Sequence, residues 1–215
     1  MTAQRIGAAG CCAVLVFAKA PVAGVAKTRL APALGPAGAA RLARRMLRHA
    51  VAQARAAALG PVQLWCAPDA AHPEFARLAR DRDVSLHVQR GADLGERMAD
   101  AMREALAAQP AALLIGTDAP AIDSGYLRRA AAALRDADVV LAPALDGGYA
   151  LIGLRRPAAL EAFAGIDWGT RRVLEQTRAR LRALPRAHVE LESVADIDEP
   201  GDLRHLPAGW QPRTG

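Results

Sequence analysis

The stretch that decides the fold runs from residue 12 to residue 30 and reads CAVLVFAKAPVAGVAKTRL. Its first six residues form an apolar run of strand length, and a loop with Pro, Gly and basic residues follows directly. Further runs of this kind recur at 62–66, 84–89, 111–116, 138–142, 149–154 and 187–191. The sequence therefore predicts a series of short strands that begins with 12–17.

Longer amphipathic segments lie between most of these runs. Their periodicity predicts helices at about 38–59, 73–80, 96–108, 124–135 and 170–183, the last with Thr170 as its N-cap. Strands that alternate with helices are typical of βαβ units, because a parallel crossover needs a helix. Only the turn 143–148 precedes 149–154, so this strand is expected to lie antiparallel. The expected fold class is α/β with a mixed, mostly parallel sheet.

Length and composition fit one domain. A chain of 215 residues is of the usual size for an α/β domain and buries roughly 70% of its unfolded surface. Apolar residues make up 52% of the chain and aromatic residues 4%, so the core is expected to be aliphatic. We expect one domain over residues 1–206, followed by a C-terminal tail at 207–215.

The formal charge of +6 raises the question of nucleic acid as a partner. The arginines do not cluster with aromatic residues; they recur on alanine-rich helical stretches, as at Arg41, Arg44, Arg45 and Arg48. This pattern is typical of a solvated helix face, and it argues against a nucleic-acid partner. A small molecule that carries phosphate suits the charge equally well.

Cysteine usage and hydropathy indicate a cytoplasmic protein. Cys11 and Cys12 are adjacent, Cys66 stands alone, and no metal-type spacing occurs. The residues before Cys11 faintly resemble a lipoprotein cleavage site but are too few for a separate apolar segment. No run reaches transmembrane length, so no membrane partner is expected. Apolar helix faces could pack in the core or against another subunit, which leaves a homo-oligomer open.

Lysine occurs only in the loop after the first strand. The chain has 28 basic residues, yet Lys19 and Lys27 are its only lysines. A compact ammonium group suits a phosphate, which a planar guanidinium contacts differently. A Walker-type loop is excluded because Pro21 and Ala26 stand where that loop needs glycine. The alternative is a surface loop with scattered charges.

Asp118 ends an apolar strand, in the stretch LLIGTDAP at 113–120. An aspartate there could cap the next helix, but Asp123 and Ser124 are better placed to do so. This leaves the carboxylate of Asp118 for a divalent cation. Mg²⁺ typically takes one or two protein carboxylates and completes its shell with phosphate oxygens.

Two later stretches add acidic residues. Asp146 precedes two glycines, which suit either a tight turn or the close approach of a ligand. Asp196 and Asp198 alternate about Ile197, so an extended segment would direct both carboxylates to one side, where one or both could meet Asp118 across a cation. Capping of a short helix that begins at Pro200 is the alternative for Asp198.

Two loops are weaker candidates. The stretch 89–97, which contains Asp93 and Gly95, could contact a base or ribose; a plain loop with a helix cap is the alternative. The stretch Asp167-Trp168-Gly169-Thr170 could line an acceptor site, although tryptophan more often serves packing.

Taken together, these motifs resemble the nucleotide-diphospho-sugar transferase superfamily. Within it the chain is similar to a bacterial glycosyltransferase-like group that is related to phospholactate guanylyltransferase and molybdenum-cofactor guanylyltransferases. The resemblance rests on FAKAP at 17–21, KTRL at 27–30, DLGERM at 93–98, GTDAP at 116–120, DGGY at 146–149 and DIDEP at 196–200. It implies a three-layer α/β/α fold of the GT-A type.

The resemblance also implies site residues. The first loop would hold donor phosphates through Lys19, Gly24, Lys27, Thr28 and Arg29, and Asp118 and Asp198 would bind Mg²⁺ or Mn²⁺. Ala119, Glu199 and Gly201 replace a serine, a threonine and a glutamate that are common in such families. These departures leave the metal site in place but weaken any inference about the substrate.

We therefore expect a metal-dependent transferase that uses a nucleoside triphosphate or a nucleotide sugar and a small-molecule acceptor. In nucleotidyl transfer, Lys27 and Arg29 would offset charge that builds on the pyrophosphate. In glycosyl transfer, Asp146 would bind or deprotonate the acceptor. The sequence leaves these two reactions equally open. A nucleotide-sensing protein that keeps the fold without turnover is the alternative from another functional class.

Overall fold

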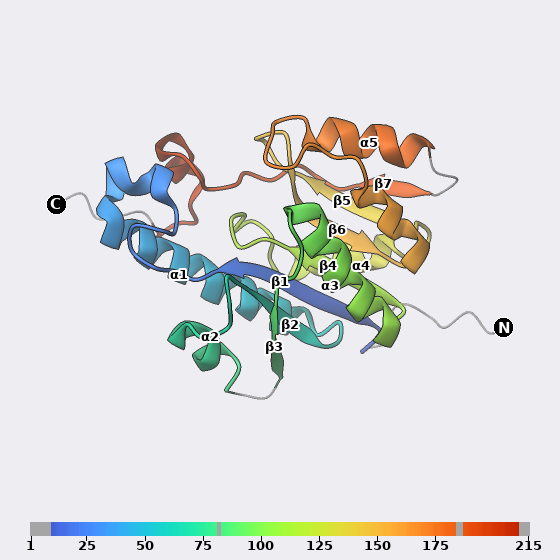
Figure 1. Cartoon of the computed structure of the whole chain (residues 1–215), viewed down its shortest axis with the longest axis horizontal. Coiled ribbons are helices and arrows are strands. Elements are labelled where there is room, and N and C mark those ends of the chain that lie inside the picture. Colours follow the sequence, from blue (N-terminus) through green and yellow to red (C-terminus); the bar gives the residue numbers. More distant parts are fainter. Residues whose placement is uncertain (1–9, 81–82, 184–186, 211–215) are drawn as a thin grey trace.

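The computed structural model describes residues 10–80, 83–183 and 187–210. Within these ranges the chain forms a sheet of seven strands in the order β3-β2-β1-β4-β6-β5-β7 (Figure 1). The strands are β1 Cys12–Lys19, β2 Val62–Ala67, β3 Val84–Val88, β4 Ala111–Ile115, β5 Val139–Pro143, β6 Tyr149–Leu154 and β7 His188–Glu190. The strands predicted from the apolar runs are all present, with ends that shift by one or two residues.

β6 is the one strand that runs against the others. It pairs antiparallel with β4 and with β5, whereas the other four pairings in the sheet are parallel. The antiparallel strand predicted from the short turn at 143–148 is thus confirmed. Because β5 remains parallel to β1 and β4, the carboxyl ends of these three strands lie at the same edge of the sheet.

Helices cover both faces of the sheet. They are α1 Ala31–Ala57, α2 Pro73–Leu78, α3 Leu94–Ala108, α4 Ser124–Ala133 and α5 Val173–Ala183, joined by 3-10 segments η1 Thr28–Leu30, η2 Pro157–Phe163 and η3 Pro200–His205. Two predicted starts were wrong. α1 begins before residue 38 and is kinked at Gly35, where φ is 65°. α5 begins at Val173, because Thr170 forms a preceding turn in which its hydroxyl accepts a hydrogen bond from the Arg172 amide.

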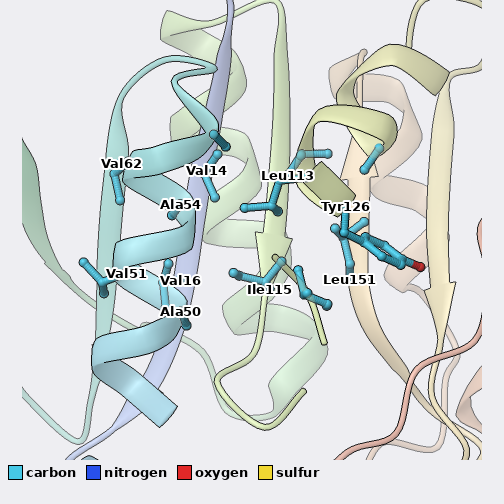
Figure 2. Close-up of a cluster of buried hydrophobic side chains, with 14 of the residues drawn as sticks. Val14, Val16, Ala50, Val51, Ala54, Val62, Leu113, Ile115, Tyr126 and Leu151 are labelled. Carbon is cyan, nitrogen blue, oxygen red and sulfur yellow. The ribbon is translucent and has the colours of Figure 1, made fainter. Parts of the chain in front are cut away.

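Alternation along β1 creates the two cores of a three-layer fold. Val14 and Val16 face α1 in a core cluster that also includes side chains of α4 and the neighbouring strands (Figure 2). Leu15 and Phe17 point to the opposite face, where α3, η2 and α5 cover the sheet. Successive strand residues face opposite sides, so a fully apolar strand is buried on both. The expected α/β/α architecture is confirmed.

The C-terminal segment returns to the first helix. Beyond β7 the chain crosses to the beginning of α1 (Figure 1), where Ile197 and Leu206 join a third apolar cluster with Leu30 and Met46. Trp210 then packs edge-on against His49, with ring centroids 5.0 Å apart. The tail expected from residue 207 is therefore packed at least as far as Trp210, and residues 211–215 lie outside the described part of the chain.

Candidate active site

The site is built around Lys27, in the loop that follows β1. The loop folds back on itself because the amides of Val25 and Ala26 both donate to the Val22 carbonyl, at 3.1 and 2.9 Å. Lys27 itself adopts a left-handed backbone, with φ 52° and ψ 44°. This conformation is uncommon outside glycine. Its side chain is only 8% exposed, so the loop delivers an ammonium group into the protein.

The ammonium group of Lys27 lies between two carboxylates. Its Nζ is 2.9 Å from Asp118 Oδ1 and 3.5 Å from Asp198 Oδ1. Among the described residues this nitrogen makes no hydrogen bond of good angular geometry, so charge attraction holds it there. Arg29 completes the cluster, because it donates to Asp198 Oδ2 at 2.8 Å while remaining largely exposed. Four of the residues expected in the site are thus brought together.

A backbone hydrogen bond explains why the two aspartates meet. The amide of Ile197 donates to the Asp118 carbonyl at 2.8 Å, and the Ile197 side chain is fully buried. This bond fixes the extended segment 192–198 against the end of β4. Asp118 and Asp198 therefore lie side by side, although they are 80 residues apart in the chain.

Neither aspartate is used as a helix cap. Asp123 caps α4 by accepting from the Tyr126 amide at 2.7 Å, as the sequence suggested. At the start of η3, Glu199 and Asp202 form a reciprocal capping box, in place of the cap considered for Asp198. The carboxylates of Asp118 and Asp198 thus remain for charged partners.

The two carboxylates are a partial donor set for a metal. Both converge on the position of Lys27 Nζ, a point that a cation occupies. Within residues 10–80, 83–183 and 187–210, no group of three or more His, Cys, Asp or Glu side chains could hold a metal ion. The residues therefore fit Mg²⁺ only if phosphate oxygens supply most of its ligands, which is its usual habit.

Asp146 lies in the hairpin turn between β5 and β6. Its Oδ1 accepts a hydrogen bond from the Gly148 amide at 2.8 Å, so the residue has a turn-forming role. Gly147 has a φ of 94°, and a side chain there would collide with the backbone of Arg171. Burial raises the pKa of the nearby Asp196 carboxyl, and the charge of Asp146 raises it further. Asp196 therefore lies close enough to Asp146 for the two carboxyl groups to interact at the edge of the site.

The remaining expected residues are placed differently. Asp93 caps α3 by accepting from the Glu96 amide at 2.8 Å, which is the alternative role considered for it. Gly95, in the first turn of α3, is covered by the indole of Trp168. Lys19 and Thr28 are exposed, as is Gly24, where φ is 79°. Thr28 stands between Lys27 and Arg29 in the chain, but the ion pairs of the charge cluster join only Lys27, Arg29, Asp118, Asp198 and Glu199.

One feature of the site edge was missed. Large apolar side chains are exposed at Val22 and Val25 after β1, at Leu94 after β3 and at Leu145 after β5. These loops all follow strand ends at the carboxyl edge of the sheet. The sequence does contain a signal for this surface, because apolar residues stand next to charged residues in these stretches. Of these, only the charged residues entered the prediction of the site.

Comparison with known proteins places these features in context. The model of a family described as "Uncharacterized protein conserved in bacteria (DUF2064)" matches residues 49–170. The chain is 31% identical to the phosphoenolpyruvate guanylyltransferase of Chloroflexus aggregans over 193 residues, which cover 87% of this chain and 93% of the relative. In the described ranges, no helix has the length and apolar character that a membrane crossing requires.

Solved structures with a similar fold include nucleotide-using transferases. A protein from Desulfovibrio desulfuricans G20, described as a nucleotide-diphospho-sugar transferase, is 30% identical with a TM-score of 0.85, over 94% of this chain and 89% of that one. The 4-diphosphocytidyl-2C-methyl-D-erythritol synthase of Anaerococcus prevotii has a TM-score of 0.63 at 9% identity, over 95% and 100% of the chains. The second similarity concerns the fold alone.

Proposed function

We propose a reaction for this chain. The chain belongs to the DUF2064 family, which lies within the nucleotide-diphospho-sugar transferase superfamily, and it is a transferase. The reaction is Mg²⁺-dependent transfer of a nucleotidyl group, guanylyl by preference, from a nucleoside triphosphate to a small acceptor that carries a phosphate. Phosphoenolpyruvate is the first acceptor to test, because a relative of 31% identity is named for it. The observation that carries the proposal is the cluster of Lys27, Arg29, Asp118 and Asp198.

The cluster suits the charge changes of this reaction. An oxygen of the acceptor phosphate attacks the α-phosphorus in line, the bond to the β-phosphate oxygen breaks, and pyrophosphate leaves. Negative charge then builds on the leaving group, and Lys27 and Arg29 would offset it as preorganised cations. Asp118 and Asp198 would hold Mg²⁺, which when bound shields the phosphate oxygens.

The acceptor needs no strong base. A phosphate monoester has a second pKa of about 6, so it is mostly deprotonated at neutral pH. We therefore assign Asp146 a positioning role, in which its turn shapes the acceptor side of the site. The exposed apolar side chains at Val22, Val25 and Leu94 would give the nucleobase a surface to cover.

Sugar transfer is the second candidate. It is favoured by the D. desulfuricans protein, which is 30% identical and carries the name of a nucleotide-diphospho-sugar transferase. The same aspartates would then hold the metal against a departing nucleoside diphosphate. The two reactions release different products, so one assay separates them.

The test is a product assay over a panel of donors and acceptors. Four nucleoside triphosphates and matching nucleotide sugars are each combined with phosphoenolpyruvate and related phosphorylated acids, with Mg²⁺ or with EDTA. We expect pyrophosphate release, fastest with GTP, and none with EDTA. Release of a nucleoside diphosphate from a nucleotide sugar would favour the second candidate, and turnover in EDTA would contradict the metal assignment.

Variants locate the reaction. Asp118→Asn and Asp198→Asn should each lower kcat about 100-fold or more, the scale for losing one preorganised electrostatic group. Asp136→Asn is the matched control, because Asp136 is exposed in the turn after α4 and takes no part in the ion pairs of the cluster. Equal loss in the control would show that the assay reports folding rather than the site.

A further inference from the structure

The position that a metal would take between Asp118 and Asp198 already holds a positive charge. We propose that the Lys27 ammonium is the resting counter-ion of these aspartates, and that it admits a divalent cation only when nucleotide phosphates are bound. The inference rests on the proposed function, since it takes a metal-phosphate complex as the ligand. It adds an order of binding, in which the metal enters with or after the nucleotide.

Distances exclude both cations from the same place. Lys27 Nζ lies 2.9 Å from one carboxylate and 3.5 Å from the other, so it occupies the space between them. A Mg²⁺ ion binds carboxylate oxygens at about 2.0–2.1 Å. An ion bound to these two oxygens would therefore lie within a few ångströms of the ammonium, and the two like charges would repel in a partly buried site.

The lysine is held in a way that lets it leave. Its Nζ makes no well-directed hydrogen bond within the described residues, so leaving breaks charge contacts alone. The lysine side chain is a flexible stem, so the ammonium can move while the backbone of the loop stays in place. Phosphate oxygens offer the ammonium replacement anions.

Arg29 keeps the site assembled during the exchange. Its guanidinium is 2.8 Å from Asp198 Oδ2, whereas Lys27 approaches Oδ1 of the same carboxylate. The side chains of Lys27 and Arg29 thus contact different oxygens of Asp198. When Lys27 moves to the phosphates, Arg29 still orients Asp198 and leaves Oδ1 for the metal.

Two consequences follow for the free protein. Its apparent metal affinity is lowered by the fraction of time in which the ammonium fills the site. Nucleotide and metal therefore bind cooperatively, each raising the affinity of the other by the same factor.

The test measures Mn²⁺ binding by the electron paramagnetic resonance signal of free Mn²⁺, in the wild type, Lys27→Met and Lys19→Met. Without nucleotide, Lys27→Met should bind Mn²⁺ about tenfold or more tightly than the wild type, which corresponds to an ammonium that fills the site about nine-tenths of the time. Lys19→Met removes the same charge from the same loop without touching the aspartates, so its Mn²⁺ affinity should stay near that of the wild type.

A second measurement uses the wild type alone. Lysine labelled with ¹³C at Cε gives two side-chain signals, because the chain has only two lysines. Mg²⁺ alone should leave the Lys27 signal in place, and a nonhydrolysable GTP analogue with Mg²⁺ should shift it. A shift of this signal with Mg²⁺ alone would overturn the proposal.

The outcomes separate the inference from the function on which it rests. If the wild type binds Mn²⁺ with the GTP analogue but Lys27→Met gains no affinity for Mn²⁺ alone, the binding order is wrong and the metal site stands. If no protein binds Mn²⁺ under either condition, the metal assignment falls and the inference falls with it.

Discussion

Replacement of Gly95 by alanine tests how α3 and the loop 164–172 fit together. A Cβ at this position would collide first with Trp168 Nε1, and it would lie 2.5 Å from Cε2 and 2.8 Å from Cζ2. Carbon atoms in contact prefer about 3.5 Å, so the indole would have to move by more than about 1 Å. Overpacking of this kind costs about 1–3 kcal/mol, and alanine returns up to about 1 kcal/mol because it favours a helix more than glycine does.

We therefore expect Gly95→Ala to lower the free energy of unfolding by about 1–2 kcal/mol, which corresponds to a fall in Tm of about 2–8 °C. In a Trp168→Ala background the collision is absent. There the same change should be neutral or stabilising by up to about 1 kcal/mol. The sign of the effect thus depends on Trp168.

The assay is urea unfolding of the four proteins of a double-mutant cycle, followed by far-ultraviolet circular dichroism at about 222 nm, where the backbone of the helices dominates the signal. A coupling free energy below about 0.5 kcal/mol would refute the packing argument. The loop also borders the Asp146 turn, because the backbone of Arg171 lies against Gly147. Gly95→Ala should therefore raise KM for the acceptor more than KM for the nucleotide.

Two further predictions concern groups away from the site. Two hydrogen bonds from Arg48 to the buried Glu74, at 2.6 and 2.9 Å, hold the pKa of that carboxyl below its ordinary value of 4.5. The stabilisation from these bonds is present above pH 4.5 and is lost as the pH falls through the lowered pKa. Glu74→Gln should therefore lower the free energy of unfolding in urea by about 1–2 kcal/mol at pH 7 and by less at pH 3. An equal loss at both pH values would contradict this prediction. Burial raises the pKa of the thiols of Cys12 and Cys66 to about 12. Ellman's reagent at pH 8 should therefore label mainly Cys11 in the native protein and all three cysteines in urea. Rapid labelling of all three cysteines in the native protein would refute the burial of Cys12 and Cys66.

Strong local patterns explain what could be predicted. The fully apolar runs at β1 and β4 identified the central strands, and the six-residue gap before β6 identified its direction. Asp118 and Asp198 were predicted to converge, which the structure bears out in position. Their use as metal ligands stays a prediction.

The contacts that depend on tertiary structure could not be predicted. The ion pairs of Lys27 join residues 91 and 171 positions apart, and no local pattern specifies such a pairing. Gly95 was considered for a ligand contact, and its close fit to the indole of Trp168 depends on which loop packs over α3, a choice made by the fold as a whole. The helix cap of Asp93 is local, and the sequence offered it as one of two alternatives.

The antiparallel strand has a consequence for how the site can move. A parallel crossover sends the chain away from the carboxyl edge into a helix, so its loop is tied to the sheet at one end only. The β5–β6 hairpin instead ties its turn at both ends to hydrogen-bonded strands. The wall that carries Asp146 is accordingly held by backbone hydrogen bonds, whereas the lysine loop is held to the site by the ion pairs of Lys27 and Arg29. Hydrogen exchange should find the slowest amides of this edge in that hairpin.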